Sequence, residues 1–245
     1  MCRGGANTIN AELMLMQEAT KEYHNYYHYI SGTDLPLMSQ TQMKLFFEKE
    51  NGKEFIGITP GWTDGKSVST RYTKYWFFQN QIGKNKRNPA YYVFKAIAKI
   101  QQKFNFVDRS KKEQQKFCGG PSWFSITHNA ACYVLEQRNW IRTRFKNTFC
   151  CDEIFMQTVI ANSPYFANLY NYDDCYTGCL RYVKFDKESP YILTEKDYDA
   201  LMKSGCLFAR KFDTKLPEQK RLIEMILTHI SEDNERENQR CNEHI

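Results

Sequence analysis

The predicted order of helices and strands along these 245 residues places the chain in the α/β class, with a mixed sheet flanked by helices. Three observations support this prediction. Apolar residues recur at helical spacing in several segments. Short runs rich in Tyr, Phe and Ile lie between those segments and are typical of strands. A hydrophobic content of 42% and a charged content of 25% are those of a globular chain long enough to bury a core.

The first half of the chain opens on a helix. Residues Thr8–Ala19 carry Ile9, Leu13 and Met16 at helical spacing. Ser39 and Gln42 form a capping box, which marks the start of a second helix. The other elements expected here are strands at 27–30, 55–58 and 72–78, and a helix opened by Asn88 and Pro89 with Val93, Ile97, Ile100 and Phe104 as its core face.

The second half continues the same alternation of elements. The turn Gly119-Gly120-Pro121 leads into a strand expected at Ser122–Thr127. The elements that follow are expected to be helices at 130–137, 152–162, 194–203 and from Pro217, and strands near 182–184 and at 207–212. We expect one domain over residues 1–230 and a loose polar tail over 231–245. Because a helix comes first, we expect the sheet to lack its first N-terminal strand.

The net charge of +6 suits an anionic partner: a nucleotide, a nucleic acid or a membrane surface. No signature of an RNA- or DNA-binding module is found, so we expect no nucleic-acid partner. No secretory leader and no run of 18 apolar residues is found in these residues. This favours a cytoplasmic, bacterial-type enzyme, and peripheral contact with a membrane stays open.

Two pairs of charged residues are candidates for chemistry. Asp152 and Glu153 stand where a helix is expected to begin, and acids there also simply suit the helix dipole. Arg210 and Lys211 lie in an otherwise apolar strand, where two adjacent cations are uncommon. Their side chains point to opposite faces on a regular strand, but both can turn toward one anion at a strand end. A position on a solvent-exposed strand edge explains these two cations equally well.

The sequence favours no metal site. Asp197-Tyr198-Asp199 matches a metal-binding DxD motif, but it lies in a capped helical pattern, where side chains two apart do not face each other. The nine cysteines lack the paired spacing of a zinc site. We therefore expect no metal ion and no other cofactor.

Six segments together resemble the core-2/I-branching family, which includes the peptide O-xylosyltransferases. Each is weak alone, but they stand in the family's order and reach about residue 213. The segments are Arg3–Gly5 with Ala11–Leu13, Tyr29–Leu37, Gly120–Ile126 with Tyr133–Leu135, Asp152–Ile160 with Asn162–Pro164, Leu180–Val183, and Leu207–Phe212.

The resemblance implies a GT-A-like fold and an inverting, metal-independent glycosyltransferase. It assigns Glu153 as the general base that takes the proton of the acceptor hydroxyl. It places Arg210 and Lys211 on the donor diphosphate, where a leaving nucleotide gathers negative charge. Arg181 is a further candidate for the diphosphate or the acceptor.

The same resemblance gives the sugar-proximal residues. The loop containing Ser31, Gly32 and Asp34 takes a place beside the donor, where Asp34 binds the sugar or orients the loop. Ser122 and Trp123 are expected to shape the sugar pocket. The position of Ser122 is an acid in some xylosyltransferase-like members, which leaves a donor contact there open.

The predicted partners are a UDP-sugar donor, with UDP-N-acetylglucosamine favoured, and a glycan or lipid-linked saccharide acceptor. One alternative is a xylosyltransferase-like activity that uses UDP-xylose. A second is a non-catalytic, truncated remnant that binds glycans, because family members usually carry a further N-terminal segment with part of the nucleoside site.

Overall fold

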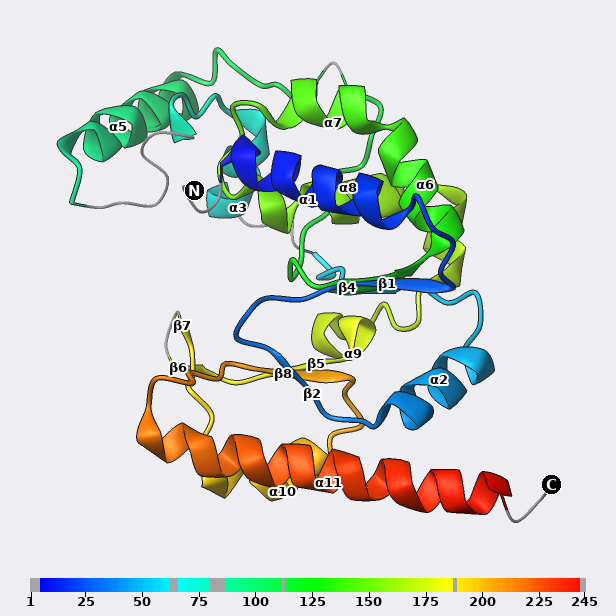
Figure 1. Ribbon diagram of the computed structural model, residues 1–245. Helices are drawn as coiled ribbons and strands as arrows, with labels where there is room; N and C mark the ends of the chain where they lie inside the picture. Colours follow the sequence, from blue (N-terminus) through cyan, green and yellow to red (C-terminus); the bar gives the residue numbers. More distant parts are fainter. Residues whose placement is uncertain (1–4, 62–65, 80–86, 112, 187–188, 243–245) are drawn as a thin grey trace. The chain divides into compact units, whose positions relative to one another are not determined.

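The computed structural model describes residues 5–61, 66–79, 87–111, 113–186 and 189–242. The chain forms two compact units. The first comprises Met1–His28 and Glu54–Gly178, and the second comprises Tyr29–Lys53 and Cys179–Ile245. The predicted α/β class is confirmed, because short mixed sheets are combined with many helices in the described residues (Figure 1).

The elements of the first unit are α1 (Ala6–Ala19), β1 (Tyr26–Tyr29), β3 (Phe55–Ile56), α3 (Lys66–Thr73), α5 (Pro89–Phe104), β4 (Phe124–Thr127), α6 (His128–Glu136), α7 (Arg138–Phe145), η2 (Cys151–Glu153), α8 (Phe155–Ala161), η3 (Pro164–Asn168) and α9 (Cys175–Cys179). The elements of the second unit are β2 (Leu35–Pro36), α2 (Gln40–Lys49), β5 (Arg181–Val183), β6 (Phe185–Asp186), β7 (Ser189–Pro190), η4 (Glu195–Asp197), α10 (Tyr198–Met202), β8 (Phe208–Arg210) and α11 (Pro217–Asn242).

The first unit is built on a sheet with the strand order β1-β4-β3. Strands β3 and β4 run antiparallel, with Phe55 opposite Ser125. Helices α1, α6, α7 and α8 gather on one side of this sheet (Figure 1). Their apolar faces bury Ile9 and Leu13 of α1 completely, as the helical spacing of these residues predicts. The α1 prediction is therefore confirmed.

A buried carboxylate lies beside β4. Glu54 is fully buried, and its oxygens accept hydrogen bonds from the hydroxyl (2.6 Å) and the backbone N–H (2.9 Å) of Thr127. Burial raises the pKa of Glu54 above its ordinary value, although the two hydrogen bonds from Thr127 oppose that shift. The residue joins the segment before β3 to the end of β4.

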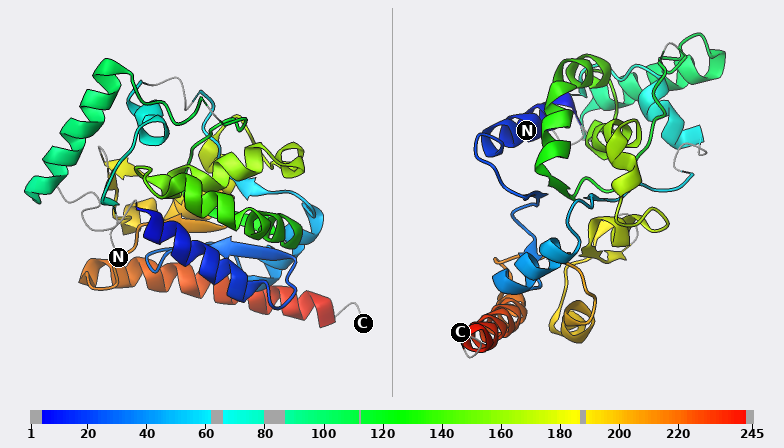
Figure 2. Two further views of the ribbon diagram at one scale, coloured as in Figure 1. Left: turned by 90° about the horizontal axis from the view of Figure 1, so that it is seen from above. Right: turned by 90° about the vertical axis from the view of Figure 1, so that its right-hand side faces the viewer.

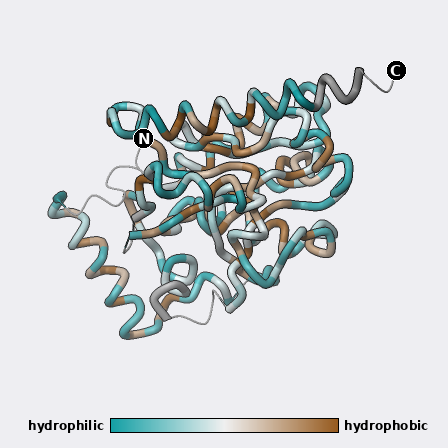
Figure 3. The backbone as a smooth tube through the Cα atoms, turned by 90° about the horizontal axis from the view of Figure 1, so that it is seen from below, coloured by the Kyte–Doolittle hydropathy of each residue, from teal (hydrophilic) through white to brown (hydrophobic). Residues whose placement is uncertain are grey.

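The second unit has β8 at the centre of a sheet with the order β2-β8-β5. Strand β8 pairs antiparallel with β2 and parallel with β5. The core of this unit is a cluster formed by Leu37, Leu193, Leu201, Ala209, Phe212, Leu222 and Ile226. The last two residues come from α11, and Figure 3 shows apolar turns recurring between hydrophilic ones along that helix.

Local capping signals predict helix starts correctly. Ser39 and Gln42 form the expected capping box at the start of α2. The side chain of Asn88 caps α5, and Pro89 occupies its first turn. In η4, Asp197 completes a capping box with Thr194 and pairs with Lys184 at 2.5 Å. These contacts agree with the helical reading of Asp197-Tyr198-Asp199.

Three local predictions are wrong. The segment 72–78 is no strand: α3 runs to Thr73, and a turn follows. Its aromatic rings pack individually instead, with Tyr72 stacked on Phe117 and Trp76 on Phe149. The expected core face of α5 is largely exposed to solvent.

The third wrong prediction concerns the C-terminus. Residues 231–242 continue α11 as a helix, because salt bridges between neighbouring turns, such as Arg236 to Glu232 at 3.4 Å, support a polar helix end. The predicted boundary between a domain that ends at residue 230 and a tail that begins at residue 231 stays a prediction. No helix in the described part of the chain combines the length and apolar character needed to cross a membrane.

Candidate functional site

The first group of candidate residues centres on Glu153, the last residue of η2. The structure divides the helix expected over 152–162 into this short turn and α8, and the break falls at Ile154. Ile154 and Phe155 are fully buried and anchor the segment, whereas the Glu153 side chain keeps 36% of its surface exposed. The carboxylate is thus held on a buried backbone and remains partly exposed to solvent.

The carboxylate of Glu153 forms an ion pair with Arg71 of α3. The Nη1 atom of Arg71 donates a hydrogen bond of 2.7 Å to Oε2 of Glu153. An ion pair with a charge-assisted hydrogen bond fixes the direction in which a carboxylate points. No local sequence pattern points to Arg71, because its partner is 82 residues away in the chain.

The turn before β4 is held against Glu153 by its backbone. The N–H of Gly120 donates to the carbonyl of Glu153 at 3.0 Å. A Cβ atom on Gly120 would lie 2.1 Å from the carbonyl oxygen of Gly57, so only glycine fits this approach. Gln157 of α8 also donates to the carbonyl of Pro121 at 2.7 Å. The structure therefore brings this turn and Glu153 together.

Ser122 and Trp123 directly follow the held turn and are half-buried. They belong to the same unit as Glu153, and the contacts of Gly120 and Pro121 keep their segment beside η2 and α8. A sugar-shaping role for these two side chains stays a prediction.

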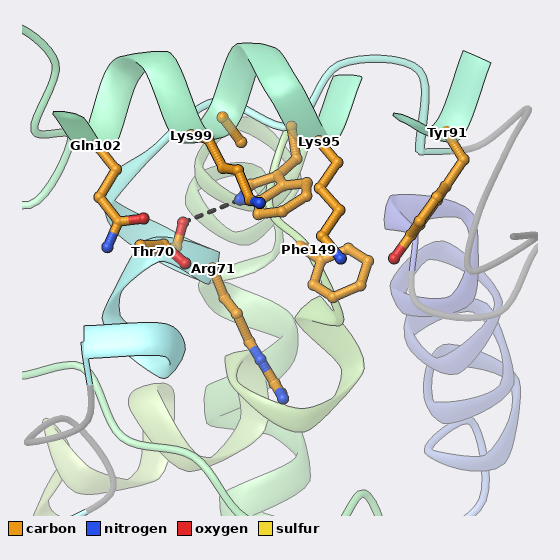
Figure 4. A pocket seen from close by; sticks show the side chains of 9 residues that line it. Thr70, Arg71, Tyr91, Lys95, Lys99, Gln102 and Phe149 are labelled. Atoms are coloured by element: carbon orange, nitrogen blue, oxygen red, sulfur yellow. Dashed lines mark hydrogen bonds between the residues drawn. The ribbon is translucent and has the colours of Figure 1, made fainter. Parts of the chain in front are cut away.

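A pocket of about 370 Å³ lies between α3 and α5 (Figure 4). Its charged lining residues are Arg71, Lys95 and Lys99. Its aromatic wall includes Trp76 and Phe149, whose rings stack with centroids 4.7 Å apart. Figure 4 shows Lys95 and Lys99 reaching down from α5. Cations beside aromatic rings suit an anionic group attached to a ring-containing ligand.

This pocket shares Arg71 with the Glu153 ion pair. The residues that line this pocket were not among the candidates predicted from the sequence. A signal was present, however: between Asp64 and Asp108 the sequence has nine Lys and Arg residues and no Asp or Glu. A segment so free of acids favours an anionic partner.

The second group of candidates lies in the second unit, at the loop before β2. The two carboxylate oxygens of Asp34 accept hydrogen bonds from the hydroxyl (2.7 Å) and the N–H (2.8 Å) of Ser31, so they close the loop around Gly32. The Asp34 side chain is only 2% exposed. These contacts are those of a residue that orients its loop.

Arg210, at the end of β8, reaches the same carboxylate. Its Nη1 atom lies 3.7 Å from Oδ1 of Asp34. Lys211 falls just beyond the end of β8 and is half-buried. The backbone carbonyl of Lys211 accepts from the N–H of Leu193 at 3.1 Å, which fixes the main chain there. The structure thus brings Ser31, Asp34 and Arg210 together.

Arg181 lies inside the second unit. It is 2% exposed, and its guanidinium packs 4.5 Å from the centre of the Phe208 ring. Its Nη1 donates to the carbonyl of Cys179 at 2.6 Å. Burial lowers the pKa of Arg181 to about 10. These contacts tie β5 to β8, and a role at the diphosphate stays a prediction.

The candidate residues thus form two groups, one within each unit. Across the described residues, no three His, Cys, Asp or Glu side chains gather in a way that could hold a metal ion. Metal independence stays a prediction.

The family model described as "Branch: Core-2/I-Branching enzyme" matches residues 1–201, which is most of the chain. A comparison with curated protein sequences finds no significant match.

Proposed function

Because the chain belongs to the core-2/I-branching enzyme family, a family of glycosyltransferases, we propose that it transfers a sugar from a UDP-sugar to an acceptor hydroxyl with inversion. The observation that carries this proposal is the Arg71–Glu153 ion pair at the edge of a cationic pocket. A partly exposed carboxylate, oriented by a guanidinium and held on a buried backbone, has the arrangement that a general base needs.

In the proposed reaction, the oxygen of the acceptor hydroxyl attacks the anomeric carbon of the donor, and Glu153 takes the proton of that hydroxyl. The bond from that carbon to the diphosphate oxygen breaks, and UDP leaves with the bonding electrons. One displacement at carbon inverts its configuration. Arg71 keeps the carboxylate pointed at the acceptor through the 2.7 Å ion pair.

We propose that basic side chains, with no metal ion, neutralise the leaving diphosphate. Lys211 supplies a compact charge, and Arg210 supplies a planar guanidinium. The 3.7 Å contact with Asp34 supports this assignment for Arg210, because it holds the guanidinium at the end of β8. The buried Arg181 supports β8 from the neighbouring strand.

The proposed donor is UDP-N-acetylglucosamine, and Ser122 and Trp123 shape the space for its sugar. UDP-xylose is the alternative donor. A different alternative is a protein that binds glycans without transferring sugar. These alternatives predict different outcomes when each donor is offered in turn.

The proposed acceptor is a lipid-linked saccharide or another glycan that carries a negative charge. The pocket beside Glu153 supports an anionic acceptor, because Arg71, Lys95 and Lys99 line it together with aromatic rings. A lipid-linked acceptor carries phosphate between its sugar and its lipid, and Lys and Arg side chains bind phosphate strongly. A protein that acts on a lipid-linked acceptor makes peripheral contact with the membrane in which that lipid lies.

A donor screen tests the proposal. The protein is incubated with UDP-N-acetylglucosamine, UDP-xylose and other UDP-sugars in excess EDTA, and the release of UDP is measured with and without acceptor. We expect release from one donor, unaffected by EDTA. Loss of activity on chelation, with recovery on adding manganese, would contradict the metal-independent mechanism. Binding of a glycan without binding of any UDP-sugar and without release of UDP would favour the glycan-binding alternative.

A further inference from the structure

A cysteine and a histidine are paired on α6. Cys132 lies one helical turn after His128, so both side chains stand on the same side of the helix. The Sγ atom of Cys132 lies 3.4 Å from Nε2 of His128. Both side chains are half-buried, so part of each remains exposed to solvent. His128 follows the end of β4, whereas the turn held against Glu153 precedes the start of that strand. The pair is therefore separate from the candidate active-site residues.

The hydroxyl of Tyr27 determines which nitrogen of His128 carries the proton. This hydroxyl donates its single hydrogen to the carbonyl of Glu22 at 2.8 Å, and it accepts from the N–H of His24 at 3.2 Å. It also lies 2.7 Å from Nδ1 of His128. Because the hydroxyl has no second hydrogen to give, Nδ1 of His128 is the donor in this contact. The neutral ring then keeps an acceptor at Nε2, which is the atom that faces Cys132.

The imidazole of His128 is held from two sides. Helix α1 packs beside α6 (Figure 2), and the chain that follows α1 brings Tyr23 and Tyr27 to the start of α6. The ring centres of Tyr23 and His128 are 4.8 Å apart. On the helix itself, the side chain of Thr127 caps α6 by accepting from the N–H of Ala130 at 3.2 Å. These contacts fix the first turn of α6 and the direction of the imidazole.

Two further titratable groups lie near Cys132. Glu136 lies one turn further along α6 and is exposed, so water screens its charge. The pKa of Tyr165 is raised by burial and by neighbouring negative charges, among them those of Glu54, Glu136 and a Cys132 thiolate. His128 is thus the base whose acceptor nitrogen faces the thiol. In the described part of the chain, no third His, Cys, Asp or Glu joins the pair to hold a metal ion.

We propose that Cys132 is a nucleophilic thiol, activated by His128, that exchanges with low-molecular-weight disulfides. Nε2 of His128 takes the proton of the thiol, and the thiolate sulfur attacks one sulfur of the disulfide. A new S–S bond forms to Cys132 while the S–S bond of the reagent breaks. The other half of the reagent leaves as a thiolate and takes the proton from His128. The disulfide is reduced as Cys132 is oxidised, so the product is a reversible mixed disulfide on α6.

The test follows disulfide exchange at each cysteine of the folded full chain. Reaction with 4,4′-dithiodipyridine is quenched at intervals, and peptide mass spectrometry measures the rate at each site. No sugar donor is present, so the result is independent of the proposed function. An ordinary thiol is almost fully protonated at about pH 6, so activation by a base is most visible there. At that pH we expect Cys132 to react roughly tenfold faster in the unmutated chain than in His128→Gln. Tyr27→Phe should lower the rate by a smaller factor, because the imidazole stays but its tautomer is no longer fixed.

Two controls accompany these variants. Cys175 is also half-buried, but burial raises its pKa, so its rate should be low and equal in all variants. Glutathione disulfide, as a second probe, should therefore modify Cys132 ahead of Cys175. His28→Gln removes another imidazole of the same unit, which contacts Ser125 at 2.8 Å, and should leave the rate at Cys132 unchanged.

The pH dependence of the unmutated chain gives a test that needs no variant. The rate of an ordinary thiol falls about tenfold per pH unit below about pH 8. We expect the rate at Cys132 to fall less than about tenfold in all between about pH 8 and pH 6, because His128 takes the proton. The ordinary slope at Cys132 would overturn the proposal whatever the variants do. Equal rates at about pH 6 for the unmutated chain and His128→Gln would also overturn it.

Discussion

Arg71 Nη1 lies 2.7 Å from Glu153 Oε2, so a cation from α3 fixes the carboxylate at the end of η2. Both side chains remain partly exposed, at 28% and 36%. Exposed ion pairs contribute little to stability, typically about 0–1 kcal/mol. The pair is therefore better explained by the orientation of the carboxylate than by a contribution to folding.

Replacing Arg71 should reduce turnover more than donor affinity. Arg71→Gln removes the charge that directs Glu153, and we expect kcat to fall roughly tenfold to a hundredfold, because misplacing a catalytic group is costly. Arg71→Lys should recover part of the loss. Steady-state kinetics and calorimetric titration of the donor separate the two effects, with exposed Arg142→Gln as control. A fall in donor affinity that matches the fall in kcat would argue against an orienting role.

Gly120→Ala should destabilise the first unit. The added Cβ would lie 2.1 Å from the carbonyl oxygen of Gly57, so the turn beside Glu153 must shift. Overpacking of this kind costs about 1–3 kcal/mol of unfolding free energy. Gly32→Ala is the control, because its Cβ would meet no atom within 4 Å. Urea denaturation of both variants measures the difference, and equal stabilities would refute the close backbone approach.

Lys211→Ala should weaken UDP binding by roughly tenfold to a hundredfold, since a charge-assisted contact is worth about 1.5–3 kcal/mol. Uridine has no phosphate, so its binding should hardly change. Calorimetric titration of both ligands tests this, with Lys215→Ala as the control at an exposed lysine of the same unit. A comparable loss for uridine would indicate a structural role for Lys211.

The burial of Glu54 makes the stability of the first unit depend on pH. Burial raises the pKa of Glu54 above 4.5, so the folded state binds this proton more tightly than the unfolded state does. The resulting stabilisation is complete below pH 4.5 and is lost as pH rises through the raised value. Glu54→Gln cannot ionise, so its unfolding free energy should decline less between roughly pH 4 and pH 8. Identical pH profiles for the two proteins in urea denaturation would contradict this assignment.

Sequence-local signals predicted much of the fold. The spacing of Ile9 and Leu13 gave α1, and Ser39 with Gln42 gave the start of α2. Both signals act between residues a turn apart, so they do not depend on tertiary structure. The strand expected at 72–78 is absent, and the rings of Tyr72 and Trp76 stack on aromatic partners distant in the sequence. The preference of aromatic residues for strands depends on their surroundings, so it does not by itself decide the local structure.

The candidate site likewise has a part that the sequence predicts and a part that depends on contacts between distant residues. The resemblance of Asp152–Ile160 to the family pointed to Glu153, but no local pattern linked it to Arg71. The apolar spacing along α5 predicted the helix correctly and its buried side wrongly, because the buried Ala98 and Gln101 anchor a neighbouring side, Gln101 through Tyr75. Periodicity shows that a helix has an apolar face but cannot show what that face contacts.

The most direct test of the central claim is the turnover of Glu153→Gln with the donor identified by UDP release. Glutamine keeps the size of the side chain and can still accept a hydrogen bond from Arg71, but it cannot take the acceptor proton. Asp152→Asn is the matched control at the adjacent carboxylate. We predict that kcat falls roughly a hundredfold or more for Glu153→Gln, with donor affinity nearly unchanged. A kcat within about threefold of the unmutated protein, well below the loss expected for a general base, would contradict the account.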